Sequence, residues 1–200
     1  MAEDSAAIVT TLDGGLAVIR FNNPAQRNPL STPTLQLLEI TLSDLLPRPD
    51  IKGVIFTGTD DVFASGANIH ELSKLDSDSA LQFSQLGQRI FQTIADAPQI
   101  TIAAISGFCM GGALDLALAC DIRVASPNAT FAHPGARLGI ITGWGGTQRL
   151  PQIVGRGRAL KLFLTARSIT SAEALHIGLV SSVTEEPLTL ARSIAGQSVA

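Results

Sequence analysis

Tyrosine is absent from the sequence, and aromatic and charged residues are scarce. The 200 residues include one Trp, eight Phe and no Tyr, and charged residues make up 16%. The absence of tyrosine excludes any mechanism that needs a phenol group. The low charged fraction suggests that part of the surface is covered by another subunit, because subunit interfaces are depleted in charged residues.

Basic residues are also few. The 14 Lys and Arg stand against 17 Asp and Glu, for a net charge of −3, which argues against non-specific nucleic-acid binding. No long uninterrupted apolar run is present, so neither a transmembrane helix nor a membrane partner is expected. Residues 1–5 lack the basic-then-apolar pattern of a signal peptide. Two cysteines, Cys109 and Cys120, are too few for a disulfide framework and predict reduced thiols in a cytoplasmic protein.

The order of expected elements is typical of an α/β fold with crossover connections. The length suits one domain, and 46% hydrophobic residues suffice for a packed core. Apolar periodicity predicts strands within 6–21 around an Asp-Gly-Gly turn and at 51–57, 101–105, 122–125 and 179–183. It predicts helices at 31–46, 80–97, 111–120, 159–165, 171–176 and 188–199, with a polar surface loop at 76–79.

The most informative motif is a strand that runs into the glycine pair Gly111-Gly112 and then into a helix. Glycines at a helix start expose unpartnered N–H groups at the positive end of the helix dipole. Such a site suits an anion, including the oxyanion that develops on a thioester carbonyl. The small-residue loop 63–70 follows another strand, and two such loops can direct two N–H groups at one oxygen. The alternative is tight strand–helix packing that needs small residues.

Five ordered segments resemble the enoyl-CoA hydratase/isomerase superfamily, the crotonase fold: NPAQRNPL (23–30), FASGANI (63–69), ISGFCMGG (105–112), CDIRVAS (120–126) and GWGGTQRLP (143–151). The resemblance implies an α/β spiral of ββα units, assembled as a homotrimer or a dimer of trimers. It implies an acyl-CoA thioester as substrate, with no metal and no cofactor beyond that coenzyme A. It divides the chain into an acyl-CoA-binding core at 1–183 and the start of a short C-terminal helical segment at 184–200.

The same resemblance implies which residues form the site. The oxyanion donors are the backbone N–H groups of Ala67 and Gly112. The first of two family glutamates falls on Asp115, which lies on the same side of the helix as the Gly112 N–H and is expected to be the acid/base. The alternative is that Asp115 only complements the helix dipole. The implied substrate-binding residues are Arg27, Ser65, Ala67, Asn68, Ile69, His70, Gly112, Gly135, Gly143 and Trp144.

Besides Asp115 in place of the first glutamate, the sequence departs from the family pattern at two positions. The second glutamate falls on Gly135, which has no side chain to donate a proton, so weak hydration is expected. His133 is the nearest titratable replacement, and Arg137 could instead clamp an acyl carboxylate, although both could be structural or surface residues. Trp144 stands where the family has a small residue, so it either fills the acyl pocket or packs against another subunit.

The leading interpretation is an enzyme that stabilises the enolate of an acyl-CoA thioester. The reaction it catalyses is then hydration or double-bond isomerisation. Isomerisation needs only one group that removes and returns a proton, so it tolerates Gly135 better. Decarboxylation of a carboxylated acyl-CoA needs no base and is a second option. A non-catalytic acyl-CoA-binding protein is the alternative from another class.

Overall fold

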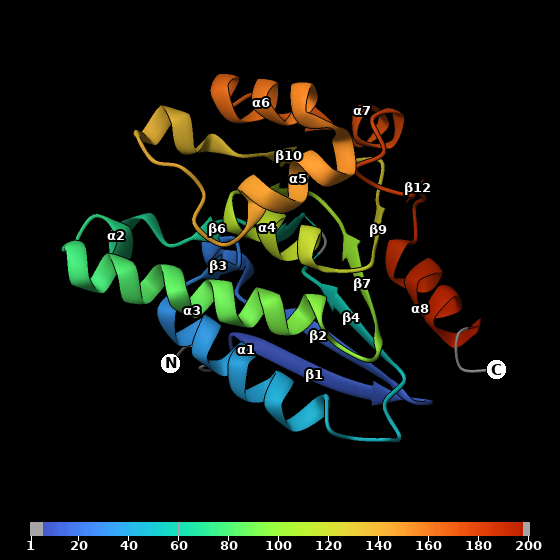
Figure 1. The fold of residues 1–200 in the computed structure, drawn as a ribbon. Coiled ribbons are helices and arrows are strands. Elements are labelled where there is room, and N and C mark those ends of the chain that lie inside the picture. Colours follow the sequence, from blue (N-terminus) through green and yellow to red (C-terminus); the bar gives the residue numbers. More distant parts are fainter. Residues whose placement is uncertain (1–5, 60, 198–200) are drawn as a thin grey trace.

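The computed structural model describes residues 6–59 and 61–197 and is built on a six-stranded sheet (Figure 1). In spatial order its strands are β1 (Ile8–Asp13), β2 (Leu16–Phe21), β4 (Gly53–Thr57), β7 (Ile100–Ile105), β9 (Ile122–Ala125) and β12 (Ser182–Val183). The first two strands pair antiparallel around Gly14 and Gly15, which both have positive φ as a tight hairpin turn requires. The remaining neighbours pair parallel, so helical crossovers must connect them.

Helices cover both faces of this sheet. The helices of the described residues are α1 (Thr32–Leu45), α2 (Ile69–Leu72), α3 (Ser77–Ala95), α4 (Gly112–Ala119), α5 (Gly146–Val154), α6 (Arg156–Thr165), α7 (Ser171–His176) and α8 (Pro187–Gln197), with 3-10 turns η1 (Pro24–Gln26) and η2 (Pro134–Leu138). Successive strand residues alternate between two apolar clusters, such as Val18 toward α8 and Ile19 toward the larger core. Figure 1 shows α8 on the opposite side of the sheet from α1 and α3.

Two smaller sheets support the start of α4. One consists of β11 (Ile169–Thr170), β10 (Thr130–Ala132), β8 (Phe108–Met110) and β5 (Val62–Ala64), and the other pairs β3 (Pro29–Leu30) with β6 (Gly66–Ala67). Strand β8 leads directly into Gly111 and α4, while β5 leads into β6 and α2. The parallel pairing of β5 with β8 therefore brings the two small-residue loops to the same part of the molecule.

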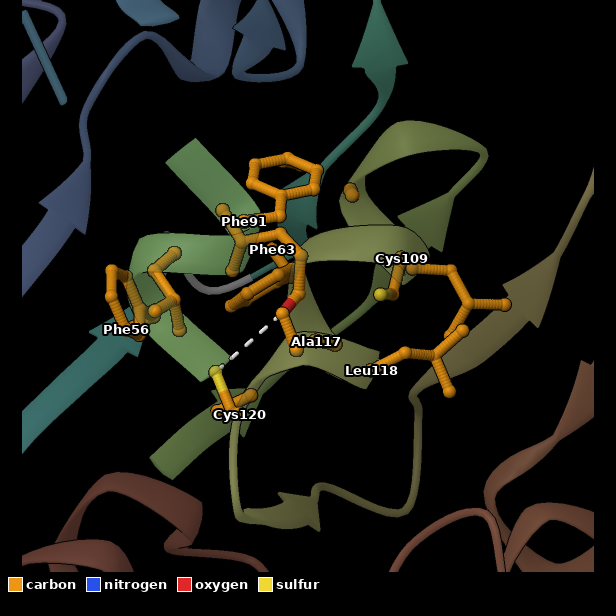
Figure 2. Packing of buried hydrophobic residues seen from close by; sticks show 14 of the residues in the cluster. Phe56, Phe63, Phe91, Cys109, Ala117, Leu118 and Cys120 are labelled. Atoms are coloured by element: carbon orange, nitrogen blue, oxygen red, sulfur yellow. Dashed lines mark hydrogen bonds between the residues drawn. The ribbon is translucent and has the colours of Figure 1, made fainter. Parts of the chain in front are cut away.

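Helix α4 lies in the middle of the larger core, and all eight of its residues are buried. Figure 2 shows Phe63 and Phe91 on the side of α4 that carries Ala117. Cys109 and Cys120 are free thiols in this core, and the Cys120 thiol donates to the Leu116 carbonyl at 3.6 Å. Burial raises the pKa of Cys120 to about 12, so this thiol is a neutral packing group.

The α/β class predicted from the sequence is confirmed, and several boundaries differ. The polar patch at 76–79 is the start of α3, because Asp76 and Ser79 form a capping box in which each side chain accepts from the other's backbone N–H, at 2.8 and 2.9 Å. The expected strand at 179–183 shrinks to Ser182–Val183, because Leu179 N–H turns back to the Ala174 carbonyl. Helix α5 was not expected.

The expectations for residues 1–5 and for the last residues of the helix expected at 188–199 lie outside the described residues. Across 6–59 and 61–197, the helices are all too short or too polar to cross a membrane.

Candidate functional site

A largely apolar cavity of about 470 Å³ lies beside the N-terminal end of α4. Its wall comes from α2, α3, η2, α6 and the chain between η2 and α5. Figure 1 shows α2, the N-terminal end of α3 and the chain between β10 and α5 on one side of the molecule. The volume falls within the range of small-molecule sites.

The cavity brings together most of the residues that the sequence placed in the substrate site. Those in its wall are Ser65, Ala67, Ile69, Gly112, Gly135, Gly143 and Trp144. The other three lie outside the wall. Arg27 places its guanidinium 5.8 Å from the ring centre of Phe108, Asn68 caps α2 by accepting from the His70 N–H at 3.0 Å, and His70 is exposed on that helix.

The two loops expected to direct N–H groups at one oxygen are in contact. Gly66 has φ +87°, and a Cβ on it would lie 2.9 Å from the Gly112 nitrogen and 2.5 Å from the Met110 carbonyl oxygen. Only glycine allows this approach, because Gly66 combines a left-handed backbone with no room for a side chain. Ala67 and Gly112 therefore line the same cavity from adjacent segments.

Asn28 fixes the strand that leads into the Ala67 loop. Its buried side-chain amide donates to the carbonyl oxygens of Val62 at 3.0 Å and Phe63 at 3.3 Å, and its Oδ1 accepts from the Asn23 N–H at 2.6 Å. Its own φ of +49° suits asparagine better than most residues. Asn28, which belongs to the family-like segment 23–30, thus has a structural role at the base of the Ala67 loop.

We expect Asn28→Ala to lower the free energy of unfolding by about 1–3 kcal/mol, because the Val62 and Phe63 carbonyl groups each lose a donor and the Asn23 N–H loses its acceptor. Urea unfolding measures this change. Asn22→Ala, which removes a half-buried amide on the same segment, is the matched control and should cost less than about 1 kcal/mol. Equal effects of the two substitutions would show that the Asn28 hydrogen bonds do not stabilise the loop.

Asp115 is fully buried and lies outside the cavity wall. Two residues of the wall contact its carboxyl group. The Thr142 hydroxyl donates to Oδ2, and the His133 Nε2 lies 3.4 Å from Oδ1. A side chain at Gly146 would overlap Oδ1, so this glycine leaves the space that the carboxyl occupies. His133 and Thr142 therefore lie between the Asp115 carboxyl and the cavity.

Burial changes the pKa of both members of this pair. Burial raises the pKa of Asp115 to about 7, although the Thr142 hydroxyl, backbone N–H groups at Trp144 and Gly146 and the Arg149 charge oppose the shift. Burial lowers the pKa of His133 to about 4. Within the described residues, neither Asp115 Oδ1 nor His133 Nε2 has a hydrogen-bond partner, so the 3.4 Å approach of these two atoms is a contact without hydrogen-bond geometry. Near neutral pH, the titrating proton of the pair is therefore on the Asp115 carboxyl, and the His133 imidazole is neutral.

Gly135 offers the cavity only its backbone. A Cβ at this position would lie 2.6 Å from the Ile140 carbonyl oxygen, so the loop has no room for a carboxylic side chain without moving. Arg137, the candidate clamp for a second carboxylate, is exposed and lies outside the cavity wall. His133 is the one ionisable side chain of the wall within the described ranges.

Trp144 is 4% exposed and packs within its own chain while contributing to the cavity wall. Its ring centre lies 5.1 Å from that of Phe83 and 5.5 Å from that of Phe91, and its indole N–H donates to the Phe83 carbonyl at 3.3 Å. A Cβ at Gly87 or at Gly112 would overlap the indole ring. Trp144 therefore fills space beside the cavity and packs against residues of its own chain.

The sequence did not single out Thr142, Gly146 or Gly87 as part of this site. The first two flank Trp144 in the glycine-rich segment, and that cluster of glycines was the signal available for them. Over the two described ranges, no three His, Cys, Asp or Glu side chains gather in a way that could hold a metal ion.

Comparisons with solved structures identify the fold as the crotonase fold. DspI of Pseudomonas aeruginosa matches with a TM-score of 0.93 and 32% identity, covering 100% of this chain and 82% of that one. An enoyl-CoA hydratase of Bacillus anthracis matches with a TM-score of 0.92 and 32% identity, over 96% of this chain and 76% of that one. The expected crotonase-type α/β architecture is thereby confirmed.

The family follows from the sequence comparisons. The family model described as "Enoyl-CoA hydratase/isomerase" matches residues 11–195. The "Short-chain-enoyl-CoA hydratase" of Clostridium acetobutylicum is 37% identical over 195 residues, or 96% of this chain and 75% of the relative. The "Crotonyl-CoA hydratase" of Syntrophomonas wolfei is 39% identical over 193 residues, 95% and 74% of the two chains. The chain belongs to the enoyl-CoA hydratase/isomerase family of enzymes, with the type of reaction left open.

Proposed function

We propose that the protein acts on acyl-CoA thioesters by stabilising an enolate oxyanion with the backbone N–H groups of Ala67 and Gly112. Asp115 supplies the carboxyl group of the proton-transfer step. The observation that carries this proposal is the buried carboxyl one helical turn from Gly112, beside a cavity that Ala67 and Gly112 both line. The names of the two curated relatives, which are hydratases of enoyl-CoA, support the same substrate class.

The composition of the cavity wall supports an uncharged acyl group. The described wall is mostly aliphatic and aromatic, with His133 as its one ionisable side chain. A second carboxylate on the acyl group would enter this wall without a cation to pair with, at a large desolvation cost. This disfavours the decarboxylation of a carboxylated acyl-CoA relative to proton transfer on a simple acyl chain.

The absence of a side chain at Gly135 favours reactions that one acid/base centre can perform. Isomerisation moves a proton from one carbon to another, and a single centre can take it and return it. Hydration by the same centre requires it first to accept a proton from water and then to deliver one to the α carbon. We therefore propose isomerisation or slow hydration, and product masses from a panel of enoyl-CoA substrates distinguish them.

CoA thioesters are expected to bind more tightly than the corresponding free acids, because the oxyanion donors act on a thioester carbonyl and the coenzyme adds contacts. Isothermal calorimetry with crotonyl-CoA and crotonate measures the difference. Coenzyme A alone is the control for contacts that do not involve the acyl group. Equal binding of crotonyl-CoA and crotonate, or no binding of either, would contradict the proposed function.

The proposed chemistry needs no metal and no cofactor beyond the coenzyme A of the substrate. We also propose a homotrimer or a dimer of trimers in the cytoplasm. Exposed apolar side chains near the cavity mouth support an assembly that covers them, since Ile141 is 72% and Leu164 is 75% exposed. Sedimentation velocity tests the assembly.

A further inference from the structure

The Asp115 carboxyl has no direct path to a molecule in the cavity. It is fully buried, and the cavity wall in front of it is formed by His133 and Thr142. Of these two, only His133 has a ring nitrogen with a lone pair that can accept a proton from a substrate carbon. Its Nε2 lies 3.4 Å from Asp115 Oδ1, which leaves Nδ1 as the ring nitrogen available to the cavity.

We infer that His133 is the catalytic residue that exchanges a proton with the substrate, through Nδ1, and that Asp115 is a positioning residue that acts through Nε2. This inference rests on the proposed function, because it names the path by which the carboxyl of that proposal reaches the substrate. His133 is the N-cap residue of η2, and Asp115 lies in the first turn of α4. Both elements lie beside the cavity.

The proton transfer balances within the pair and the substrate. In the base form, ionised Asp115 accepts from Nε2–H and the Nδ1 lone pair faces the cavity. Nδ1 takes a proton from the α carbon, the C–H electrons move into the thioester as an enolate, and the Ala67 and Gly112 N–H groups stabilise its oxygen. The Nδ1–H group then returns the proton to a carbon of the substrate, which restores the base form.

Proton transfer within the pair avoids the buried charge that either residue alone would carry. A buried imidazolium is unfavourable at the His133 position, where burial is the cause that lowers its pKa. When Nδ1 takes a proton, the Nε2 proton can pass to Oδ1, so that a neutral imidazole faces a neutral carboxylic acid. No isolated positive charge then remains in the apolar wall.

Other ionisable groups near the pair do not replace either member. Arg149 of α5 acts on Asp115 from outside the cavity wall and stabilises its ionised form. The Cys109 thiol of β8 is buried and neutral, because burial and the Asp115 charge raise its pKa. The proton exchange is therefore expected to follow the titration of the His133–Asp115 pair.

The test is exchange of the α protons of butanoyl-CoA in deuterated water, followed by mass spectrometry across pH. This saturated thioester requires only proton abstraction and return. We expect His133→Gln to slow exchange by about 10²-fold or more, with thioester binding retained. Asp115→Asn is expected to slow it by about 10²-fold and to abolish the rise of the rate through about pH 7. The exposed His176→Gln on α7 is the matched control.

The exchange rate of the double variant His133→Gln/Asp115→Asn distinguishes the two roles most directly. Because Asp115 acts through His133, the double variant should be no slower than His133→Gln alone. Multiplied losses, or unchanged exchange in His133→Gln, would overturn the inference and leave the proposed function standing. If the wild type binds butanoyl-CoA and catalyses no exchange, the proton-transfer function fails, and the inference with it.

Discussion

Trp144→Ala is expected to lower the free energy of unfolding by about 3–5 kcal/mol, one of the largest losses that a single substitution in this chain can cause. The indole is 4% exposed and sits against Phe83 and Phe91. Its removal leaves a large void above Gly87 and Gly112 and takes the donor away from the Phe83 carbonyl.

Urea unfolding of the variant measures the loss, and two further variants serve as controls. Trp144→Phe keeps an aromatic ring in place and should cost less than Trp144→Ala. Phe108→Ala removes a ring that is 45% exposed and should cost about 1 kcal/mol or less. A loss below about 1 kcal/mol for Trp144→Ala would mean that the ring is not part of the core packing.

The second large effect concerns how stability depends on pH. At about pH 5, the unfolded chain carries the proton of this pair on His133, whose ordinary pKa is 6.5, while Asp115, with an ordinary pKa of 3.8, is ionised. The native pair instead carries that proton on Asp115, with its pKa of about 7, and leaves His133 neutral, with its pKa of about 4. Both states bind the same number of protons, so the pair adds almost no pH dependence between about pH 4 and 6.5.

Each single substitution is expected to make the free energy of unfolding depend on pH, with opposite signs in the two variants. In His133→Gln, the native state binds more protons than the unfolded state from about pH 4 to 7, so stability falls as pH rises, by about 4 kcal/mol in all. In Asp115→Asn, the unfolded state binds more protons from about pH 4 to 6.5, so stability rises with pH, by about 3 kcal/mol.

Urea unfolding across this pH window, with each variant compared with the wild type at the same pH, measures both slopes. Asp44→Asn, which changes an exposed carboxyl on α1, should give a curve parallel to that of the wild type. Curves for His133→Gln and Asp115→Asn that also run parallel to the wild type would contradict the opposite pKa shifts of the buried pair.

The sequence predicted the α/β class and most of the loops around the cavity because these depend on local patterns. Glycines before α4 and small residues before α2 mark backbone that a ligand can approach, and seven of the ten predicted binding residues do line the cavity. The start of α3 was missed although Asp76 and Ser79 are both polar capping residues, because the apolar periodicity begins later, near Phe83.

The arrangement around Asp115 could not be predicted from spacing. A helical turn places Asp115 on the same side as the Gly112 N–H, but its burial depends on the segment that carries Thr142 and on the space left by Gly146. His133 lies in a different element, so its contact with the carboxyl is a tertiary one. The position of Trp144 likewise depends on Gly87, a residue of α3 that no local motif connects to it.

The contact of one indole ring with two glycines constrains the order in which this sequence can change during evolution. A side chain at Gly87 or Gly112 is incompatible with Trp144, so either substitution would be selected against while the tryptophan is present. Once position 144 carries a small residue, the same substitutions lose that steric penalty, and the return to tryptophan is then blocked. The three positions therefore form an epistatic unit, and close relatives that differ at position 144 are where alanine at positions 87 or 112 should first occur.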